Sequence, residues 1–160
     1  MSTEKQAAAG EGKPGRADTH SHRKDFSAGG VVVRGDDVAV IVPRRRGSQG
    51  GTVLGLPKGH PDGDETEVEA AIREVREETG LVAEPVAKLG EVRYSYERKG
   101  KPIDKRVAFY LLEYRSGELS HDHEIEQVQW MPIEEALEAL TYSGEREMVA
   151  RALSRRASDR

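Results

Sequence analysis

Three glutamates fall within about one turn of a single predicted helix, in the stretch REVREETG at residues 73–80. Glu74 stands three and four positions before Glu77 and Glu78, so the three carboxylates can share one patch of the helix surface. Like charges at this spacing cost roughly a few tenths of a kcal/mol per pair on an isolated helix. A chain that folds this way must therefore neutralise the patch.

The helix itself is predicted to run from Glu65 to Thr79, followed by Gly80 at a position where glycine commonly ends a helix. Asp64 and Glu67 have the spacing of a capping box. The buried stripe is predicted to comprise Val68, Ile72, Val75 and Thr79.

The opposite, polar side of this helix carries the glutamates, with Ala70 leaving space beside them. Arg73 stands four positions from both Glu69 and Glu77, so it can pair with either and orient part of the array. From this pattern alone, a solvated acidic helix face remains the alternative to a binding site.

The loop before the helix, LPKGHPDGDE, favours the binding site because it brings backbone carbonyls, a lysine and a histidine to the helix start. Carboxylate and carbonyl oxygens suit Mg²⁺, with Mn²⁺ also possible. A metal held by this patch would recruit a phosphate-bearing substrate. Lys58 and the run Arg44-Arg45-Arg46 could then contact the phosphates directly.

Composition excludes several other classes. A net charge of −4 argues against a general binder of nucleic-acid polymers or membranes. No apolar run approaches the roughly 18 residues of a membrane span, and no signal-peptide core is visible. The absence of cysteine excludes disulfides and fits a reducing compartment, so we expect a cytoplasmic protein. We expect a monomer or a homodimer.

The chain is organised as one predicted domain over residues 25–154, between a disordered tail at 1–24 and a frayed end at 155–160. His20 and His22 fall in that solvated tail. A hairpin is predicted around Gly35–Asp37, followed by a loop from Gly47 to Gly63 with a short strand at Thr52–Leu56. The remaining predicted elements are strands Val86–Glu97, Ile103–Tyr114 and Gln127–Met131, and helices Ile133–Leu140 and Gly144–Leu153. Mixed strands and helices without a repeat predict an α/β layered fold.

Residues 59–81, GHPDGDETEVEAAIREVREETGL, resemble the Nudix box without a gap. The resemblance extends from about Ser27 to Leu153, since SAGGVVV is similar to the family's first core strand and EQVQWMPIEEALEAL to its last strand and helix. It implies an α/β/α sandwich around a mixed β-sheet. It also implies an enzyme that hydrolyses a pyrophosphate bond in a nucleotide.

The resemblance also implies roles for individual residues. Glu74, Glu77 and Glu78 correspond to the metal-binding glutamates, with Glu77 and Glu78 also counted as catalytic. Arg73 corresponds to the arginine that orients a catalytic glutamate, and Gly59 to the residue whose carbonyl often joins the metal shell. Glu65 corresponds to an acid with a more structural role.

The general base is not fixed by the box, because in this family it is sometimes a box glutamate and sometimes an acid from a later loop. The stretch HDHEIEQ at residues 121–127 offers Glu124 and Glu126. We favour Glu124, because His123 and Glu124 before Trp130 resemble the pattern of diadenosine tetraphosphate hydrolases. An ordinary polar loop is the alternative. Trp130 itself is interpreted as a packing residue.

The branch is indicated by LPKGH before the box and by KRVAFYLLEY at residues 105–114, which resemble diadenosine polyphosphate hydrolases. The matching lysine there contacts the polyphosphate, which implies the same role for Lys58. Substrate contacts are also predicted for Arg44 and Tyr94, with Tyr96 and Tyr142 as further stacking candidates. As single aromatics, these tyrosines are more often packing residues.

Two other functions stay open. Hydrolysis of an oxidised nucleotide, 8-oxo-dGTP or 8-oxo-GTP, is the main alternative enzyme, because its hydrolases share LPKGH. A non-catalytic nucleotide-sensing Nudix module is the alternative from another class. Such modules tend to lose box acids, whereas this chain keeps them all.

Overall fold

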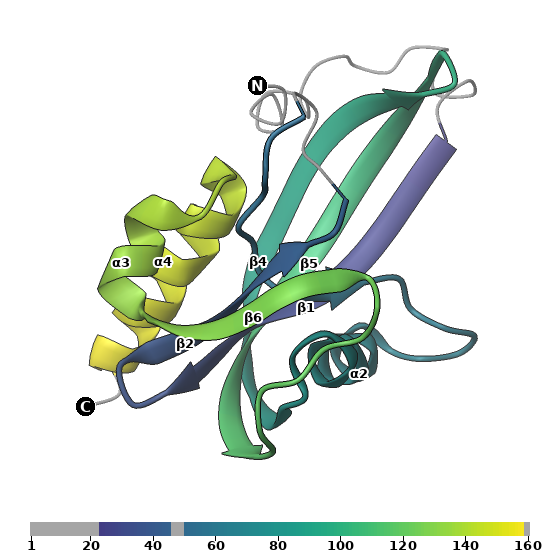
Figure 1. The fold of residues 1–160 in the computed structure, drawn as a ribbon. Helices are drawn as coiled ribbons and strands as arrows, with labels where there is room; N and C mark the ends of the chain where they lie inside the picture. Colours follow the sequence, from purple (N-terminus) through teal and green to yellow (C-terminus); the bar gives the residue numbers. More distant parts are fainter. Residues whose placement is uncertain (1–22, 46–49, 159–160) are drawn as a thin grey trace.

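The computed structural model describes residues 23–45 and 50–158. Within them, a twisted mixed sheet has the strand order β4-β5-β1-β2-β6, and the two-residue strand β3 also pairs with β1 (Figure 1). The strands are β1 (Arg23–Arg34), β2 (Asp37–Pro43), β3 (Lys58–Gly59), β4 (Val82–Arg98), β5 (Lys101–Ser116) and β6 (Ile125–Pro132). Of the strand pairs that include β1, that with β5 is parallel, while those with β2 and β3 are antiparallel.

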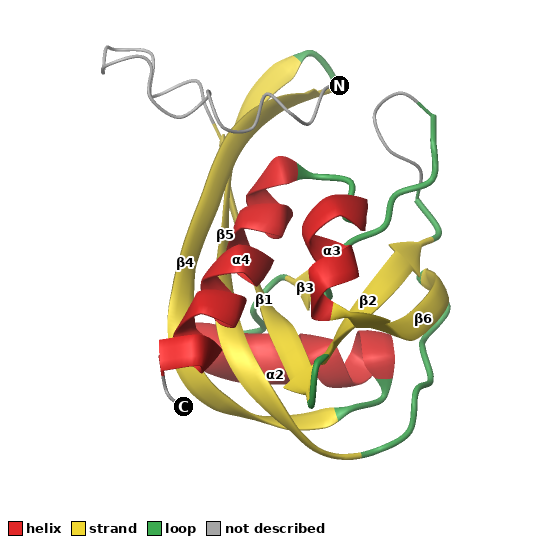
Figure 2. Ribbon diagram, turned by 90° about the vertical axis from the view of Figure 1, so that its left-hand side faces the viewer, coloured by secondary structure: helices red, strands yellow, loops and turns green. Residues whose placement is uncertain are grey.

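Within the described part of the chain, three helices cover the two faces of this sheet. Helix α2 (Glu67–Thr79) lies on one face, and α3 (Ile133–Ala139) and α4 (Ser143–Ser158) pack together on the other (Figure 2). The predicted α/β fold with a mixed sheet between helix layers is therefore confirmed.

Alternation along β1 explains why both faces are covered. Val31 and Val33 belong to the core cluster beneath α3 and α4, whereas Val32 belongs to the cluster beneath α2. Side chains in a strand point alternately to opposite faces, so an uninterrupted run of valines needs apolar cover on both sides. Phe109 of β5 and Met148 of α4 complete the first cluster, and Val75 of α2 belongs to the second.

Several predicted boundaries need correction. Arg23 and Lys24, expected in the tail, already pair with β5, while residues 1–22 with His20 and His22 lie outside the described residues. The predicted strand Thr52–Leu56 is wrong: Gly55 forms an isolated bridge to Ile41, and the pairing strand falls at Lys58–Gly59 instead. Helix α4 continues to Ser158, well beyond the predicted end at Leu153.

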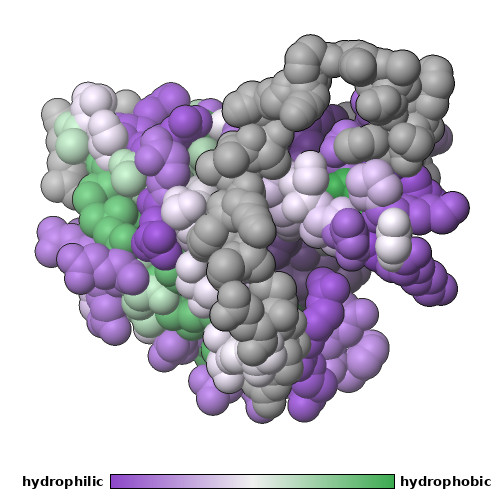
Figure 3. All heavy atoms as spheres, turned by 90° about the horizontal axis from the view of Figure 1, so that it is seen from above, coloured by the Kyte–Doolittle hydropathy of each residue, from purple (hydrophilic) through white to green (hydrophobic). Residues whose placement is uncertain are grey.

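The face of the molecule seen in Figure 3 is mostly polar. Viewed from above, hydrophilic residues dominate the visible described atoms, with smaller hydrophobic areas toward one side (Figure 3). Across residues 23–45 and 50–158, none of the helices combines the length and apolar character needed to cross a membrane.

Candidate active site

Helix α2 begins at Glu67 because Thr66 caps it. The Thr66 hydroxyl accepts a hydrogen bond from Glu69 N at 3.2 Å, and Glu69 Oε1 accepts one from Thr66 N at 3.0 Å. The predicted capping box of Asp64 and Glu67 is therefore wrong, and the real one lies two residues later. Gly80 ends the helix as predicted, with a φ of 82° that suits glycine.

The faces of α2 differ from the predicted stripe in two places. Val75 and Thr79 are buried as expected, but Val68 and Ile72 are only partly covered. Ala70, expected among the acids, is fully buried in a small alanine-rich cluster. Its small side chain therefore allows close packing against β1 rather than leaving space beside the glutamates.

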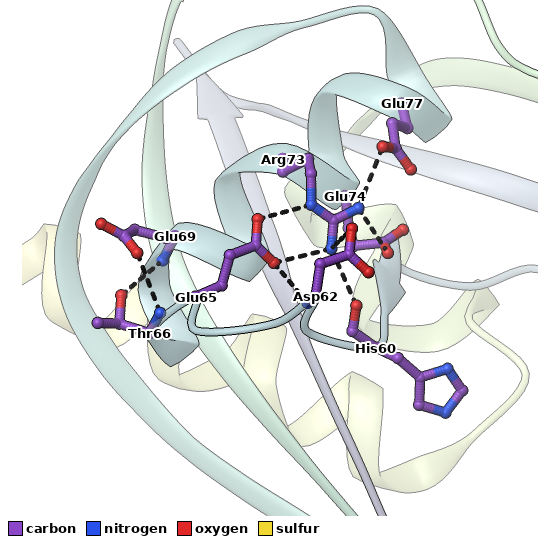
Figure 4. A network of polar contacts seen from close by, with 8 residues as sticks. All are labelled: His60, Asp62, Glu65, Thr66, Glu69, Arg73, Glu74 and Glu77. Atoms are coloured by element: carbon purple, nitrogen blue, oxygen red, sulfur yellow. Dashed lines mark hydrogen bonds and ion pairs between the residues drawn. The ribbon is translucent and has the colours of Figure 1, made fainter.

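Arg73 lies at the centre of the acidic patch (Figure 4). Its Nε and Nη2 donate to the two oxygens of Glu65 at 2.7 and 3.0 Å, and its Nη1 donates to Glu74 and Glu77, each at 3.1 Å. These hydrogen bonds to Glu65, and further ones to Glu77 and Glu74, raise the pKa of Arg73, which stays charged. The predicted pairing with Glu69 is wrong, because that carboxylate belongs to the cap.

The loop before α2 is held against this network. Arg73 Nη2 donates to the carbonyl of His60 at 2.9 Å, and Asp62 N donates to Glu65 Oε1 at 2.8 Å. Gly59 packs so closely on Glu74 that a Cβ at this position would overlap the carboxylate. The glycine is therefore required by close approach, which places its backbone directly beside a predicted metal ligand.

Glu78 is buried, with 8% of its surface exposed, and its Oε1 accepts a hydrogen bond from Lys58 N at 3.1 Å. Burial raises the pKa of Glu78 to about 8; Lys58 opposes this rise, while the charges of Glu74 and Asp122 add to it. Burial likewise raises the pKa of Glu74. The positive charge of Arg73 opposes this rise, and the negative charge of Glu77 adds to it.

The chemistry of these acids fits a divalent cation. Its positive charge would offset the cost of burying the ionised carboxylates of Glu74 and Glu78 and would reduce the repulsion between them. Among the residues that the structure describes, no three carboxylate or imidazole side chains are already arranged to hold a metal ion by themselves. Glu77 is half-exposed and bonded to Arg73, so its side chain would have to turn to join Glu74 and Glu78. The metal-ligand assignment of all three, and of the Gly59 carbonyl, stays a prediction.

Lys58 connects this patch to α4. Its Nζ lies 3.6 Å from Oε2 of Glu145, a carboxylate that is only 4% exposed. Although burial opposes it, the charge of Glu145 raises the pKa of Lys58, so the ammonium stays protonated. Sequence reasoning missed Glu145, although its spacing from the buried Met148 and Val149 gave a signal that it faces inward.

Lys105 is a buried lysine close to the partly exposed Lys58. Burial lowers the pKa of Lys105 most, and the charge of Lys58 lowers it further. Lys105 donates to Asp25 Oδ2 at 3.1 Å and to Ser27 Oγ at 2.8 Å. Asp25 also accepts from Tyr96, and its other oxygen lies 2.8 Å from His60 Nε2. Strands β1, β4 and β5 thus join the loop of the box through one carboxylate.

Tyr94 and Arg44, both predicted to contact substrate, lie in different surroundings: Tyr94 packs on the core, and Arg44 bonds to a loop. Tyr94 packs against the core cluster beneath α4, and burial raises its pKa. Its ring centroid is 6.2 Å from that of Tyr96. Arg44 donates from Nε to the carbonyl of His123 at 2.8 Å, which ties it to the loop before β6. Trp130 packs edge-on against Tyr114 with Arg34 over its face, in agreement with a packing role.

The loop before β6 reaches α2 through Ser120, whose N–H donates to the carbonyl of Thr79 at 2.9 Å. Asp122 on this loop is partly buried, and its charge acts on Glu78. Glu124, the predicted base, has an exposed side chain, while its backbone N–H donates to Asp122 Oδ1 at 3.0 Å. Asp122, between two histidines, was not singled out from the sequence.

Comparison with known proteins agrees with the family predicted from the sequence motif. The family model described as NUDIX domain matches residues 24–152. A Mycobacterium tuberculosis (strain CDC 1551 / Oshkosh) protein named "Putative mutator protein MutT4" is 40% identical over 133 residues, covering 78% of this chain and 52% of that protein. The 8-oxo-(d)GTP phosphatase of Mycolicibacterium smegmatis is 35% identical over 100 residues, covering 62% and 30%. The asymmetrical bis(5'-nucleosyl)-tetraphosphatase of Caenorhabditis elegans is 35% identical over 92 residues, covering 54% and 64%.

The chain therefore spans about half the length of the first of these relatives, and less than two thirds of the other two. Two solved structures share the fold. The MutT Nudix hydrolase of Burkholderia pseudomallei has a TM-score of 0.66 at 22% identity, covering 81% of this chain and 98% of that one. A C. elegans Ap4A hydrolase has a TM-score of 0.61 at 24% identity, covering 84% and 98%.

A family model matched over most of the chain agrees with the unbroken box on α2 and the sheet around it. The predicted family is confirmed: the chain belongs to the Nudix hydrolase family.

Proposed function

We propose that this chain is a Mg²⁺-dependent pyrophosphohydrolase that cleaves a phosphoanhydride bond in a nucleotide, with dinucleoside polyphosphates as the favoured substrates and ATP as a product. The observation that carries the proposal is the position of Lys58. Its backbone N–H binds the buried carboxylate of Glu78, and the positive charge of its side chain also acts on Glu78. A phosphate chain held there would meet both the metal-binding acids and a fixed cation.

Nudix hydrolases generally use divalent metal ions and act on nucleotide substrates. In this chain Glu74, Glu77 and Glu78 would hold the ion, with the Gly59 carbonyl beside them. When bound, Mg²⁺ neutralises phosphate oxygens and lowers the pKa of an attacking water. Mn²⁺ has the same ligand preference and is a possible substitute.

The remaining residues of the site position the glutamates and the phosphate, or take the proton of the attacking water. Arg73, fixed by both oxygens of Glu65, holds Glu74 and Glu77 in orientation. Lys58 draws a phosphate toward the patch. An acid of the loop before β6 takes the proton of the attacking water, with Glu124 as the sequence-based candidate and Asp122 as a second one, because Asp122 lies within electrostatic reach of Glu78.

Two observations support a long polyphosphate. Lys105 lies near Lys58, and the charge of Arg45 reaches Lys105 as well, so positive charge continues beyond the box. Tyr94 and Tyr96 stand next to each other near these cations, which suits stacking on a purine. The C. elegans relative named as an asymmetrical tetraphosphatase supports the same substrate class.

Hydrolysis of an oxidised nucleotide is the second candidate. Its support comes from relatives, since the M. tuberculosis and M. smegmatis proteins are named as a mutator protein and as an 8-oxo-(d)GTP phosphatase. A nucleotide-sensing module has less support, because Glu74, Glu77 and Glu78, the three glutamates assigned to metal binding, are all present on α2.

The proposal is tested by Mg²⁺-dependent hydrolysis of diadenosine tetra- and hexaphosphate, 8-oxo-dGTP, dGTP and ADP-ribose, with the products separated by chromatography. We expect the dinucleotides to be preferred and ATP to be released. A preference for 8-oxo-dGTP would select the second candidate instead. No turnover of any compound, with nucleotide binding retained, would select the sensing module.

Lys58→Met provides the test of the observation that carries the proposal. We expect KM for diadenosine hexaphosphate to rise more than KM for dGTP, because a longer phosphate chain depends more on a cation beyond the metal. Lys99→Met, at the exposed tip of the β4–β5 hairpin, is the matched control. Equal losses on long and short substrates would mean that Lys58 is not a polyphosphate contact.

A further inference from the structure

We propose that Glu145 is a positioning residue for Lys58: a carboxylate on α4 that holds the lysine ammonium where it meets the polyphosphate. The inference rests on the proposed function, which assigns Lys58 to phosphate binding. Glu145 is 4% exposed, and its Oε2 lies 3.6 Å from Lys58 Nζ. A buried carboxylate beside a proposed substrate contact needs an explanation, because burying a charge is costly unless it is paired.

Glu145 is itself fixed by contacts that do not involve Lys58. Its Oε1 accepts a hydrogen bond from Leu56 N at 3.0 Å. It lies in the first turn of α4, where the helix dipole favours negative charge. The backbone of Gly55 leaves room for it, since a Cβ there would come within 3.1 Å of Oε1. The carboxylate is therefore a rigid reference point for the lysine.

Lys58 needs such a reference for two reasons. A lysine side chain is a flexible four-carbon stem, so its ammonium is not confined by its own geometry. In addition, Lys105 lies near enough to repel it, and Lys105 has a carboxylate of its own in Asp25. Each of the two lysines thus has a carboxylate partner. An ammonium has three donors, so one pairing leaves donors for phosphate.

Lys58 also connects Glu145 to the helix that carries the box glutamates. The backbone N–H of Lys58 binds Glu78 of α2 and its side chain pairs with Glu145 of α4, so helices from opposite faces of the sheet meet at one residue. Glu145 therefore acts on substrate through Lys58 and is not expected to touch the reacting atoms.

Because Glu145 is negatively charged, a positioning role can be distinguished from simple charge repulsion of the substrate. If Glu145 acted only as a nearby negative charge, removing it would strengthen the binding of a polyanion, because like charges repel. If it positions Lys58, removing it weakens that binding. The two interpretations predict opposite signs.

The experiment measures the affinity of inorganic tripolyphosphate in Mg²⁺ buffer by titration calorimetry. The variants are Glu145→Gln, Lys58→Met and the double variant. Glutamine keeps an oxygen that can accept from Leu56 N but has no charge to hold Lys58. We expect Glu145→Gln to weaken binding about tenfold, equivalent to ~1.4 kcal/mol, and to have no further effect when Lys58 is already methionine. Glu147→Gln, on the same helix but exposed and paired with Arg151, should bind like wild type.

An affinity equal to or tighter than that of wild type in Glu145→Gln would overturn the inference. So would an equal loss with and without Lys58, because the two residues would then act independently. A purely structural role would lower the melting temperature without ligand but leave affinity unchanged in the folded protein. If Glu145→Gln does not fold, Glu145→Asp replaces it: the charge stays but is withdrawn, and weaker binding is still expected, whereas unchanged binding would overturn the inference.

Failure of the inference can be told apart from failure of the proposed function. Tripolyphosphate binding does not require turnover, so coupling between Glu145 and Lys58 can be measured even if no compound of the panel is hydrolysed. An active enzyme in which Glu145→Gln leaves affinity unchanged would overturn the inference alone.

Discussion

At the residue scale, Glu78 places an ionisable carboxyl group in a buried position. Its pKa is raised to about 8 by burial, which means that the folded chain holds this carboxylate at a cost when it is ionised. The backbone N–H of Lys58 compensates part of that cost. Such a group is poorly explained by stability, and well explained by a cation that it binds during function.

Glu78→Gln is therefore expected to reduce Mg²⁺-dependent hydrolysis by at least about 100-fold, since even outer groups of a metal site commonly cost 10–100-fold. The fold should survive, because an amide can still accept from Lys58 N. Turnover is measured under saturating substrate, together with circular dichroism. Glu138→Gln on the exposed side of α3 is the control, and near-normal turnover in Glu78→Gln would contradict the metal assignment.

The general base can be settled by comparing two acids of the loop before β6. If Asp122 takes the proton, Asp122→Asn lowers kcat by about 100-fold or more, in the range of general-base catalysis, while Glu124→Gln has a small effect. The opposite pattern would select Glu124, which was the prediction from sequence. Single-turnover rates for both variants should be measured, because they report the chemical step separately from product release.

Sequence spacing is sufficient to predict that the three glutamates, Arg73 and Lys58 lie near one another, because these residues belong to one helix and the loop before it. It could not find contacts made across the chain. Glu145 and Leu56 are 89 positions apart, and Asp25 and Lys105 are 80 apart. Only the pairing of distant strands and the docking of α4 bring these groups together.

At the element scale, the start of α2 shows how a correct rule can be placed on the wrong residues. Both Asp64–Glu67 and Thr66–Glu69 have the spacing of a capping box. The second is used because Glu65 N bonds the carbonyl of Asp62, which closes a turn before the helix, and because the Glu65 carboxylate is committed to Arg73. The hydrogen bonds around Arg73 thus contribute to where the helix begins.

Thr66→Ala tests the cap. Loss of an N-cap hydroxyl typically costs about 1 kcal/mol, so the free energy of unfolding should fall by about that amount in urea denaturation. Thr66→Ser keeps a hydroxyl and should retain most of the stability. A Thr66→Ala variant as stable as wild type would mean that the first turn of α2 does not depend on this bond.

At the scale of the whole molecule, a charged network ties α2 to the β4–β5 hairpin. Lys88 donates to Glu67 at 3.0 Å and to Glu91 at 2.9 Å, and Arg106 donates to Glu91 at 2.8 Å. Burial raises the pKa of Glu67, but contacts with Lys88, Tyr110 and Arg106 outweigh it and hold this pKa below its ordinary value. The pKa of Glu91 is lowered by Lys88 and Arg106, again against the effect of burial.

The sign of this effect predicts a loss of stability in acid. A carboxylate with a lowered pKa in the folded state stabilises the fold above its unfolded pKa of about 4.5, and that contribution disappears as the pH falls through the folded value. Urea denaturation at pH 7 and near pH 3 should show a smaller acid-induced loss for Glu67→Gln than for wild type. Equal losses in both proteins would show that Glu67 does not contribute to the pH dependence.

The layered fold as a whole was predictable, because the hydrophobic runs of the strands and the apolar periodicity of the helices can be recognised along most of the chain. The strand lengths were not. β4 starts at Val82 instead of Val86 and ends at Arg98 instead of Glu97, while β5 runs from Lys101 to Ser116 instead of from Ile103 to Tyr114. Each strand continues as long as its backbone finds a partner, whatever the polarity of its side chains. The short strand at Lys58–Gly59 was also missed, because it exists only through its contact with β1.

The parallel pairing of β1 with β5 has a consequence for how the molecule is made. During synthesis, the first strand leaves the ribosome long before the strand that completes its hydrogen bonds, as the 80-residue separation of Asp25 and Lys105 illustrates. Contacts between such distant segments slow folding, because a long loop must close first. Until β5 is made, the valine-rich first strand lacks the partner on one of its two sides, so we expect a chain truncated before β5 to aggregate instead of folding as a smaller domain.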